Sequence, residues 1–130
     1  MVKIKYTAGY KYQLNEDYTV ATPIVPQQAI DTHFIKLTMD GVLTVRADYA
    51  WDGPSGPTID TPDFMRGSLV HDALYQLMRE RHLDYQVHRK PADRLLRALC
   101  IEDGMKELRA NAVYDGVRIF GEACAKPREK

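Results

Sequence analysis

The chain has 130 residues, of which 45% are hydrophobic and 28% charged, and its 18 basic residues balance 18 acidic ones. This length suits a single domain with its own hydrophobic core. Zero net charge argues against a nucleic-acid-binding protein, which normally carries a basic excess. Residues 1–6 lack the apolar run of a signal peptide, and no stretch reaches membrane-spanning length. Because Cys100 and Cys124 are too few for a disulfide scaffold, we expect a cytoplasmic protein with reduced thiols.

Residues 1–50 are predicted to be rich in β-strands. The first stretch carries several tyrosines, and aromatic residues favour strands. The clearest element is a hairpin over residues 34–49, where apolar and polar residues alternate. Placing Leu37 opposite Leu43 puts the apolar residues on one face and leaves a three-residue loop, 39–41. Gly41 would then adopt the left-handed conformation of a bulge.

Residues 51–60 are predicted to form a turn-rich loop. Asp52 offers a carboxylate, and Gly53 and Gly56 let the backbone approach a ligand closely. Carboxylates and free backbone carbonyls are the ligands that a hard cation such as calcium prefers. An ordinary connection between a strand and a helix would have the same composition, so the loop alone does not decide between the two interpretations.

From residue 61 onward the apolar residues follow the period of helices. The first helix is expected to run to about His82, capped by Thr61 or Asp63, with Pro62 in its first turn. The second is expected to start near Pro91 and to bury the stripe Ala92, Leu95, Leu96, Leu99 and Cys100. The third, at about 105–120, should bury Leu108, Ala112, Val113, Val117 and Phe120.

The predicted fold class is therefore α+β, with a small N-terminal antiparallel sheet followed by three helices. We expect one domain over residues 1–130. It comprises a β-rich region (residues 1–50), the loop (51–60), a helical region (61–124) and a mobile tail (125–130).

The residues with the clearest chemical potential lie on the first two helices. His71 and Tyr75 are four residues apart and share a helix face, and Asp93 lies on the next helix. A histidine that is oriented by a carboxylate keeps one tautomer and can take a proton from water. An isolated histidine is more often a packing residue, and an acidic residue in the first turn of a helix is favoured by the dipole alone. The combination favours a catalytic pair over coincidence.

Asp72 follows His71 directly, and adjacent side chains on a helix diverge. Asp72 therefore suits a metal ligand better than a partner of His71, and together with Asp52 it could bind calcium. Zinc is disfavoured because the histidines lack compact ligand spacing and neither cysteine lies near another ligand.

These residues carry a resemblance. The pattern His71-Asp72-x-x-Tyr75, preceded by a glycine-containing loop and followed by Asp93, resembles the active-site signature of the phospholipase A2 superfamily. The resemblance covers about residues 49–101 and is greatest to short bacterial and fungal members. It implies that His71 is the general base, that Asp93 orients it, and that Tyr75 hydrogen-bonds Asp93. It also implies that Asp52, Asp72 and the Gly53 carbonyl bind calcium.

The chain lacks the cysteines that join the two catalytic helices in secreted members of that superfamily, and its first half is β-rich. Over most of its length it is similar to a family encoded by tailed phages and prophages. That second resemblance implies a viral source, and a location in the host cytoplasm or in the virion, but no particular activity.

Two functional hypotheses follow. The first is a calcium-dependent hydrolase that acts on phospholipid or another ester. The second is a non-enzymatic virion, tail or host-interaction protein, in which the same polar residues lock two helices together.

Overall fold

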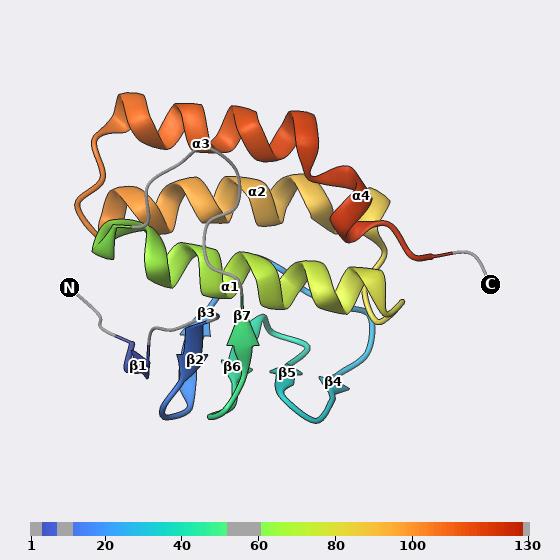
Figure 1. Cartoon of the computed structure of the whole chain (residues 1–130). Coiled ribbons are helices and arrows are strands. Elements are labelled where there is room, and N and C mark those ends of the chain that lie inside the picture. Colours follow the sequence, from blue (N-terminus) through green and yellow to red (C-terminus); the bar gives the residue numbers. More distant parts are fainter. Residues whose placement is uncertain (1–3, 8–11, 52–60, 129–130) are drawn as a thin grey trace.

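The computed structural model describes residues 4–7, 12–51 and 61–128 and confirms the α+β class. The molecule is layered (Figure 1): the small antiparallel sheets are covered by α1, which is followed by α2 and then by α3. Helix α4 lies at one end of these helices. The strands are β1 (Tyr6–Thr7), β2 (Tyr12–Leu14), β3 (Tyr18–Ala21), β4 (Ile30–Asp31), β5 (Ile35–Leu37), β6 (Val42–Val45) and β7 (Ala50–Trp51). The helices are α1 (Pro62–Arg79), α2 (Tyr85–Glu102), α3 (Glu107–Phe120) and α4 (Glu122–Ala125).

The predicted hairpin is formed by β5 and β6. Leu37 lies opposite Leu43, and the Thr38 N–H bonds the Val42 carbonyl at 3.0 Å, which leaves a three-residue loop, 39–41. Gly41 in this loop has a φ of 92°. The second strand ends earlier than expected, at Val45, because the chain bends at Asp48, where φ is 77°. The chain then enters β7, which pairs with β2 in a separate sheet of order β1-β2-β7. The hairpin itself belongs to the sheet β3-β6-β5-β4.

Helix α1 lies between the sheets and α2, and for this reason most of its side chains are buried. It begins after Thr61, with Pro62 at its first position, as predicted. Its close contact with α2 depends on Gly67, where a Cβ atom would lie 3.1 Å from both Cys100 Sγ and Leu96 Cδ1. The side chains that line the sheet face of α1 and those between the helices form two neighbouring apolar clusters.

The prediction that α2 starts near Pro91 is wrong. The helix begins two turns earlier, after Asp84, whose side chain accepts a hydrogen bond of 2.9 Å from the Gln86 N–H. Pro91 lies inside the helix and cannot donate to the carbonyl of Val87. Val87 is 60% exposed, so water can replace the missing donor. Asp93 consequently lies in the middle of α2, where a helix-dipole explanation for it no longer applies.

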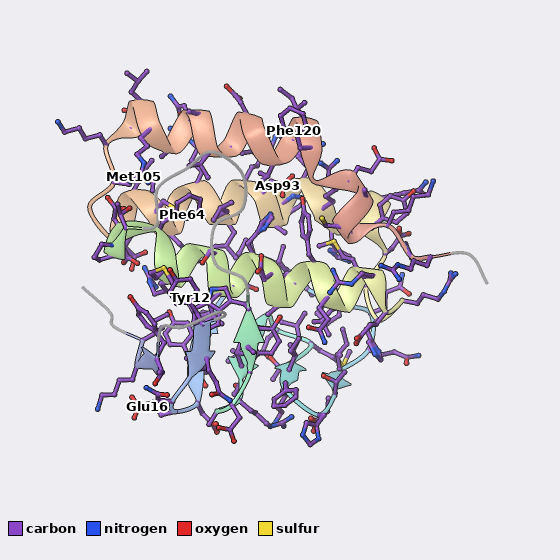
Figure 2. The ribbon with its side chains drawn as sticks, in the orientation of Figure 1. Tyr12, Glu16, Phe64, Asp93, Met105 and Phe120 are labelled. Carbon is purple, nitrogen blue, oxygen red and sulfur yellow. The ribbon has the colours of Figure 1, made fainter. Side chains whose placement is uncertain are left out.

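The buried face predicted for α3 is also wrong in some positions. Leu108 and Phe120 are 84% and 80% exposed, and Ala112 is exposed as well. Val113 is buried as predicted, together with Ala110, which was not predicted. Figure 2 shows Phe120 on this outermost helix. The buried stripe of α3 was misplaced because the small side chain of Ala110 makes the close contact with α2. The larger side chains of Leu108 and Phe120 face outward. No helix was predicted after residue 120, yet α4 follows there, and Ala125, which was assigned to the mobile tail, is fully buried in it.

Helices α1 and α2 end in the same hydrogen-bonded motif with different residues at its left-handed position. In α1 this residue is Arg81, with a φ of 69°, and the N–H of His82 bonds the Leu77 carbonyl at 2.8 Å. In α2 it is Gly104, with a φ of 102°, and the N–H of Met105 bonds the Cys100 carbonyl at 2.9 Å. A side chain at this position is strained, and glycine is not.

We therefore expect Arg81→Gly to raise the free energy of unfolding by about 1 kcal/mol. The loss of an exposed hydrogen bond from Arg81 to the Arg128 carbonyl reduces the gain only slightly. The matched change Gly104→Ala should lower the same quantity by a similar amount. Urea denaturation of the three proteins measures both, and a less stable Arg81→Gly variant would contradict the prediction.

Candidate functional site

The predicted cluster of His71, Tyr75 and Asp93 is present between α1 and α2. His71 Nε2 lies 2.7 Å from Asp93 Oδ1, and the Tyr75 hydroxyl donates to the same oxygen at 2.6 Å. The His71 and Tyr75 rings lie in contact, with centroids 4.0 Å apart, as expected for residues four apart on a helix. All three side chains are buried, and Asp93 is fully so.

Asp93 is ionised despite its burial. Burial by itself would raise the pKa of this carboxyl group. Hydrogen bonds from His71 and Tyr75, and the neighbouring charges, have the larger combined effect and lower the pKa below its ordinary value. An ionised carboxylate can only accept hydrogen bonds. The proton of the bond between the two residues therefore belongs to His71 Nε2, and in the neutral ring the lone pair lies on Nδ1.

The Nδ1 atom of His71 is the position in the cluster at which a ligand can be bound. It has no hydrogen-bond partner among the described residues. No side-chain nitrogen or oxygen in that portion of the chain is both fully buried and without a partner. The residue as a whole is 7% exposed, and Nδ1 is the ring nitrogen left for a ligand. A water molecule at this position could donate a hydrogen bond to Nδ1 and lose its proton to it.

Tyr75 is a fixed donor to Asp93. Burial raises the pKa of Tyr75 strongly, and the adjacent negative charge of Asp93 raises it further, so the phenol keeps its proton. The hydroxyl oxygen accepts a hydrogen bond of 3.1 Å from Arg89 Nε. Tyr75 therefore orients the carboxylate and does not supply a base of its own.

Two arginines that the sequence patterns did not identify complete the cluster. Arg118, on α3, donates to Asp93 Oδ2 at 2.7 Å. Arg89, on α2, lies 4.0 Å from the same oxygen. It also donates to the carbonyls of Val117 and Arg118, at 2.6 and 3.0 Å, near the end of α3. The candidate site is thus built by three helices and not by the two that were predicted.

The reasons for missing the two arginines differ. Arg89 precedes Asp93 by four residues, which on one helix is the spacing of an ion pair. This signal was overlooked because the helix was expected to start near Pro91. For Arg118 the sequence contains no comparable local signal, since only the packing of α3 on α2 brings it to Asp93.

The described residue that precedes the predicted calcium-binding loop lies beside this site. Trp51, the last residue of β7, donates a hydrogen bond of 3.1 Å from Nε1 to Ser68 Oγ. Ser68 lies on α1, one turn before His71. Thr61, the next described residue, precedes the first turn of the same helix. Trp51 and Thr61, the described residues on either side of positions 52–60, therefore both lie at α1.

Of the three predicted calcium ligands, Asp72 alone lies among the described residues. Asp72 is half-buried and directly follows His71 on α1. Asp52 and Gly53 lie outside the described residues. Within residues 4–7, 12–51 and 61–128, no three His, Cys, Asp or Glu residues are grouped as a metal site would need. Calcium therefore remains a prediction.

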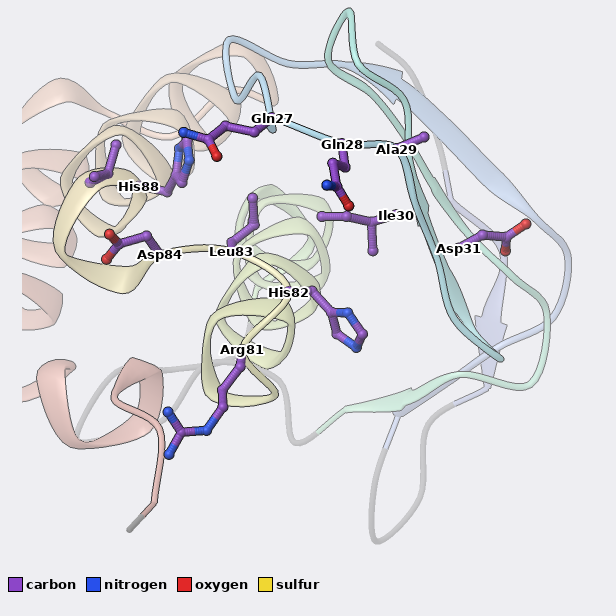
Figure 3. Close-up of a pocket in the computed structure, with 11 residues that line it drawn as sticks. Gln27, Gln28, Ala29, Ile30, Asp31, Arg81, His82, Leu83, Asp84 and His88 are labelled. Carbon is purple, nitrogen blue, oxygen red and sulfur yellow. The ribbon is translucent and has the colours of Figure 1, made fainter.

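A hollow of about 560 Å³ lies at the opposite end of α1 from the loop. Figure 3 shows Gln28 and Ile30 on one side of it, and Leu83 and His82 on the other. His82 follows His71 by 11 residues and lies beyond the end of α1, which is at Arg79. No residue of the His71 cluster lines this hollow, so we treat it as separate from the candidate site.

No family model, curated protein or solved structure matches this chain. Among the described helices, none combines the length and the apolar character needed to cross a membrane. Both cysteines have free thiols, and Cys100, which is buried, has a pKa raised by burial to about 12. The structural support for a function therefore comes from the cluster.

Proposed function

We propose that the protein is a hydrolase of ester bonds in which His71 is the general base. The observation that carries this proposal is the arrangement of its ring. Nε2 is bonded to the buried carboxylate of Asp93 at 2.7 Å, and Nδ1 has no hydrogen-bond partner among the described residues. This is the arrangement that a histidine needs to remove a proton from water, because the carboxylate fixes the tautomer and stabilises the imidazolium that forms.

In the proposed reaction a water molecule bound at Nδ1 loses a proton to His71 while its oxygen attacks the acyl carbon of the substrate. A tetrahedral intermediate forms, and the bond from the acyl carbon to the alcohol oxygen then breaks. The proton on Nδ1 passes to the departing alcohol oxygen, which regenerates the neutral ring. The products are a carboxylic acid and an alcohol. Asp93 remains ionised throughout, because Tyr75 and Arg118 stay bonded to it.

We further propose calcium as the cofactor, held by Asp52, Asp72 and the Gly53 carbonyl. Support comes from the half-buried position of Asp72 beside His71 and from the anchoring of Trp51 one turn away. When bound, calcium supplies positive charge for the carbonyl oxygen of the ester. Hard oxygen ligands of this kind suit calcium better than zinc.

The resemblance to phospholipase A2 favours a phospholipid as the ester, and the similarity to phage-encoded proteins favours a phage source and action in the host cytoplasm. A second function, a non-enzymatic component of the virion or a host-interaction protein, is favoured by a different observation. Asp93 has hydrogen bonds to both oxygens and Arg89 within 4.0 Å, so the cluster also qualifies as a complete buried polar network between helices.

Hydrolysis assays on a matched pair of variants separate the two functions. We expect wild-type protein to release fatty acid from phosphatidylglycerol vesicles, or alcohol from a soluble short-chain ester. His71→Asn should lower the rate by about 10²- to 10⁴-fold, the usual contribution of a general base. His82→Asn, an exposed histidine beyond the end of the same helix, should leave the rate unchanged. Thermal melts establish that both variants fold.

The calcium proposal is tested in the same samples. Millimolar calcium should raise the melting temperature of the wild type by binding only to the folded state, and a chelator should reverse the change. Asp72→Asn should lose most of this shift. An equal shift in both proteins would place the metal elsewhere. If neither ester is cleaved, or if His71→Asn is as active as the wild type, the hydrolase proposal fails and the structural function is favoured.

A further inference from the structure

Helix α3 contributes a single side chain to the cluster, that of Arg118. Its guanidinium donates to Asp93 Oδ2 at 2.7 Å, whereas His71 and Tyr75 both use Oδ1. The terminal torsion of an aspartate side chain is soft and has two nearly equivalent orientations. Donors on one oxygen alone would leave the carboxylate plane free to turn. A third donor on the other oxygen fixes it.

Arg118 also supplies the formal charge that Asp93 requires. A fully buried carboxylate is stable only when it is paired with a cation. Neither Tyr75 nor a neutral His71 carries a positive charge. Arg89 lies at 4.0 Å from Oδ2 and makes its hydrogen bonds to other atoms. When His71 is neutral, the directly bonded cation at Asp93 is Arg118.

The backbone that carries Arg118 is itself held in place from α2. Arg89 Nη2 donates to the carbonyls of Val117 and Arg118, at 2.6 and 3.0 Å. Through Nε the same guanidinium also bonds the Tyr75 hydroxyl at 3.1 Å. Arg89 thus connects the end of α3 with the residue that orients Asp93 from α1.

We propose that Arg118 is a positioning residue for His71. It holds the Asp93 carboxylate in the orientation in which Oδ1 faces Nε2, and in this way it keeps the proton on Nε2 and the lone pair on Nδ1. This inference rests on the proposed function, because only a base needs its lone pair at a fixed atom. It makes α3 a member of the catalytic unit, although the helix contributes no group that touches the substrate.

The tautomer of His71 can be observed directly by long-range ¹H–¹⁵N correlation spectra of histidine-labelled protein. Spectra are recorded at about pH 8.5, where ordinary histidine side chains are neutral. We expect one tautomer in the wild type, protonated at Nε2. Arg118→Met should give a mixture of both tautomers. Arg118→Lys keeps a charged donor and should give a larger share of the Nε2-protonated tautomer than Arg118→Met.

The matched control is Arg97→Met. Arg97 also links α2 to α3, through a 2.6 Å hydrogen bond to Asn111 Oδ1, but lies outside the cluster. It should leave the His71 signals unchanged. If Arg118→Met fails to fold, Arg118→Gln takes its place; its shorter, uncharged side chain does not bring a donor to Asp93 Oδ2, so it should also give mixed tautomers. A single Nε2-protonated tautomer in a folded Arg118→Met or Arg118→Gln variant would overturn the proposal. Mixed tautomers in the Arg97→Met control would also overturn the proposal.

The spectra do not depend on hydrolysis, so the two proposals can fail separately. An inactive wild type with the expected spectra would reject the hydrolase and keep the role of Arg118 in fixing the ring. In an active enzyme we expect Arg118→Met to lower kcat by about 10- to 100-fold, with KM little changed. Partial recovery in Arg118→Lys would distinguish orientation from general loss of stability. A kcat unchanged in folded Arg118→Met would contradict the proposal.

Discussion

Asp93→Ala should lower the free energy of unfolding by about 3–5 kcal/mol, because it removes one partner from a buried ion pair. The fully buried carboxylate accepts hydrogen bonds from His71, Tyr75 and Arg118. Without it, their donors lose their acceptor, and the positive charge of Arg118 is left partly buried beside a cavity. Urea denaturation, monitored by circular dichroism, measures the loss.

A matched pair of isosteric changes separates charge from shape. Asp93→Asn keeps the size of the side chain but presents an amide NH₂ or a neutral oxygen to Arg118. It should therefore still lower the free energy of unfolding clearly. Asp84→Asn makes the same chemical change at the start of the same helix. It should cost almost nothing, because asparagine caps helices as well as aspartate does. Equal effects of the two changes would contradict an ionised Asp93.

The pH dependence gives a further check on Asp93. Its pKa in the folded protein is lower than the ordinary value of about 3.9, so the unfolded chain binds its proton more readily. The stabilisation is therefore complete above about pH 4 and is lost as the pH falls through the lower, folded-state pKa. We expect the difference in stability between wild type and Asp93→Asn to be constant near neutral pH and to shrink under acidic conditions.

Gly121→Ala should destabilise the protein by about 1–3 kcal/mol through overpacking. A Cβ atom at this position would lie 2.5 Å from the Val117 carbonyl oxygen and 2.9 Å from the Tyr75 hydroxyl. The backbone of Gly121 has a φ of −83°, so the effect comes from the contacts and not from backbone strain. Because Tyr75 would have to move, we also expect its hydrogen bond to Asp93 to weaken.

The nearby Gly116 is the control for this substitution. A Cβ atom there would have no neighbour within 4 Å, and the residue lies inside α3. Gly116→Ala should therefore raise the free energy of unfolding by about 0.5–1 kcal/mol, through the better helix propensity of alanine. Thermal and urea denaturation of both variants provide the measurement. A neutral or stabilising Gly121→Ala would show that Tyr75 can shift without penalty.

The features of the fold that were predicted correctly depend on short-range patterns. Alternation of apolar residues gave the register of Leu37 with Leu43, since a shift by one residue would turn every side chain to the other face. The spacing of His71 and Tyr75 placed them on one side of α1 for a similar reason. A compatible apolar stripe on the next helix was then sufficient to bring Asp93 to them.

The features that were missed depend on context. Pro91 is a strong signal for the start of a helix, yet an N-cap at Asp84 and an exposed turn around Val87 tolerate it in the interior. The orientation of α3 could not be deduced from its apolar residues, because Leu108 and Phe120 are large and yet exposed. The contact of Arg118 with Asp93 follows only from that orientation.

The position of Asp93 among three helices also affects how the molecule can come apart. His71 is 22 residues before Asp93, and Arg118 is 25 residues after it. Detachment of α3 would remove the cation from a buried carboxylate, and separation of α1 from α2 would remove two of its donors. The buried charge of Asp93 therefore opposes partial opening both between α1 and α2 and between α2 and α3. We therefore expect this single ionised side chain to make the helical layers unfold together, without a stable intermediate in which α3 alone is released.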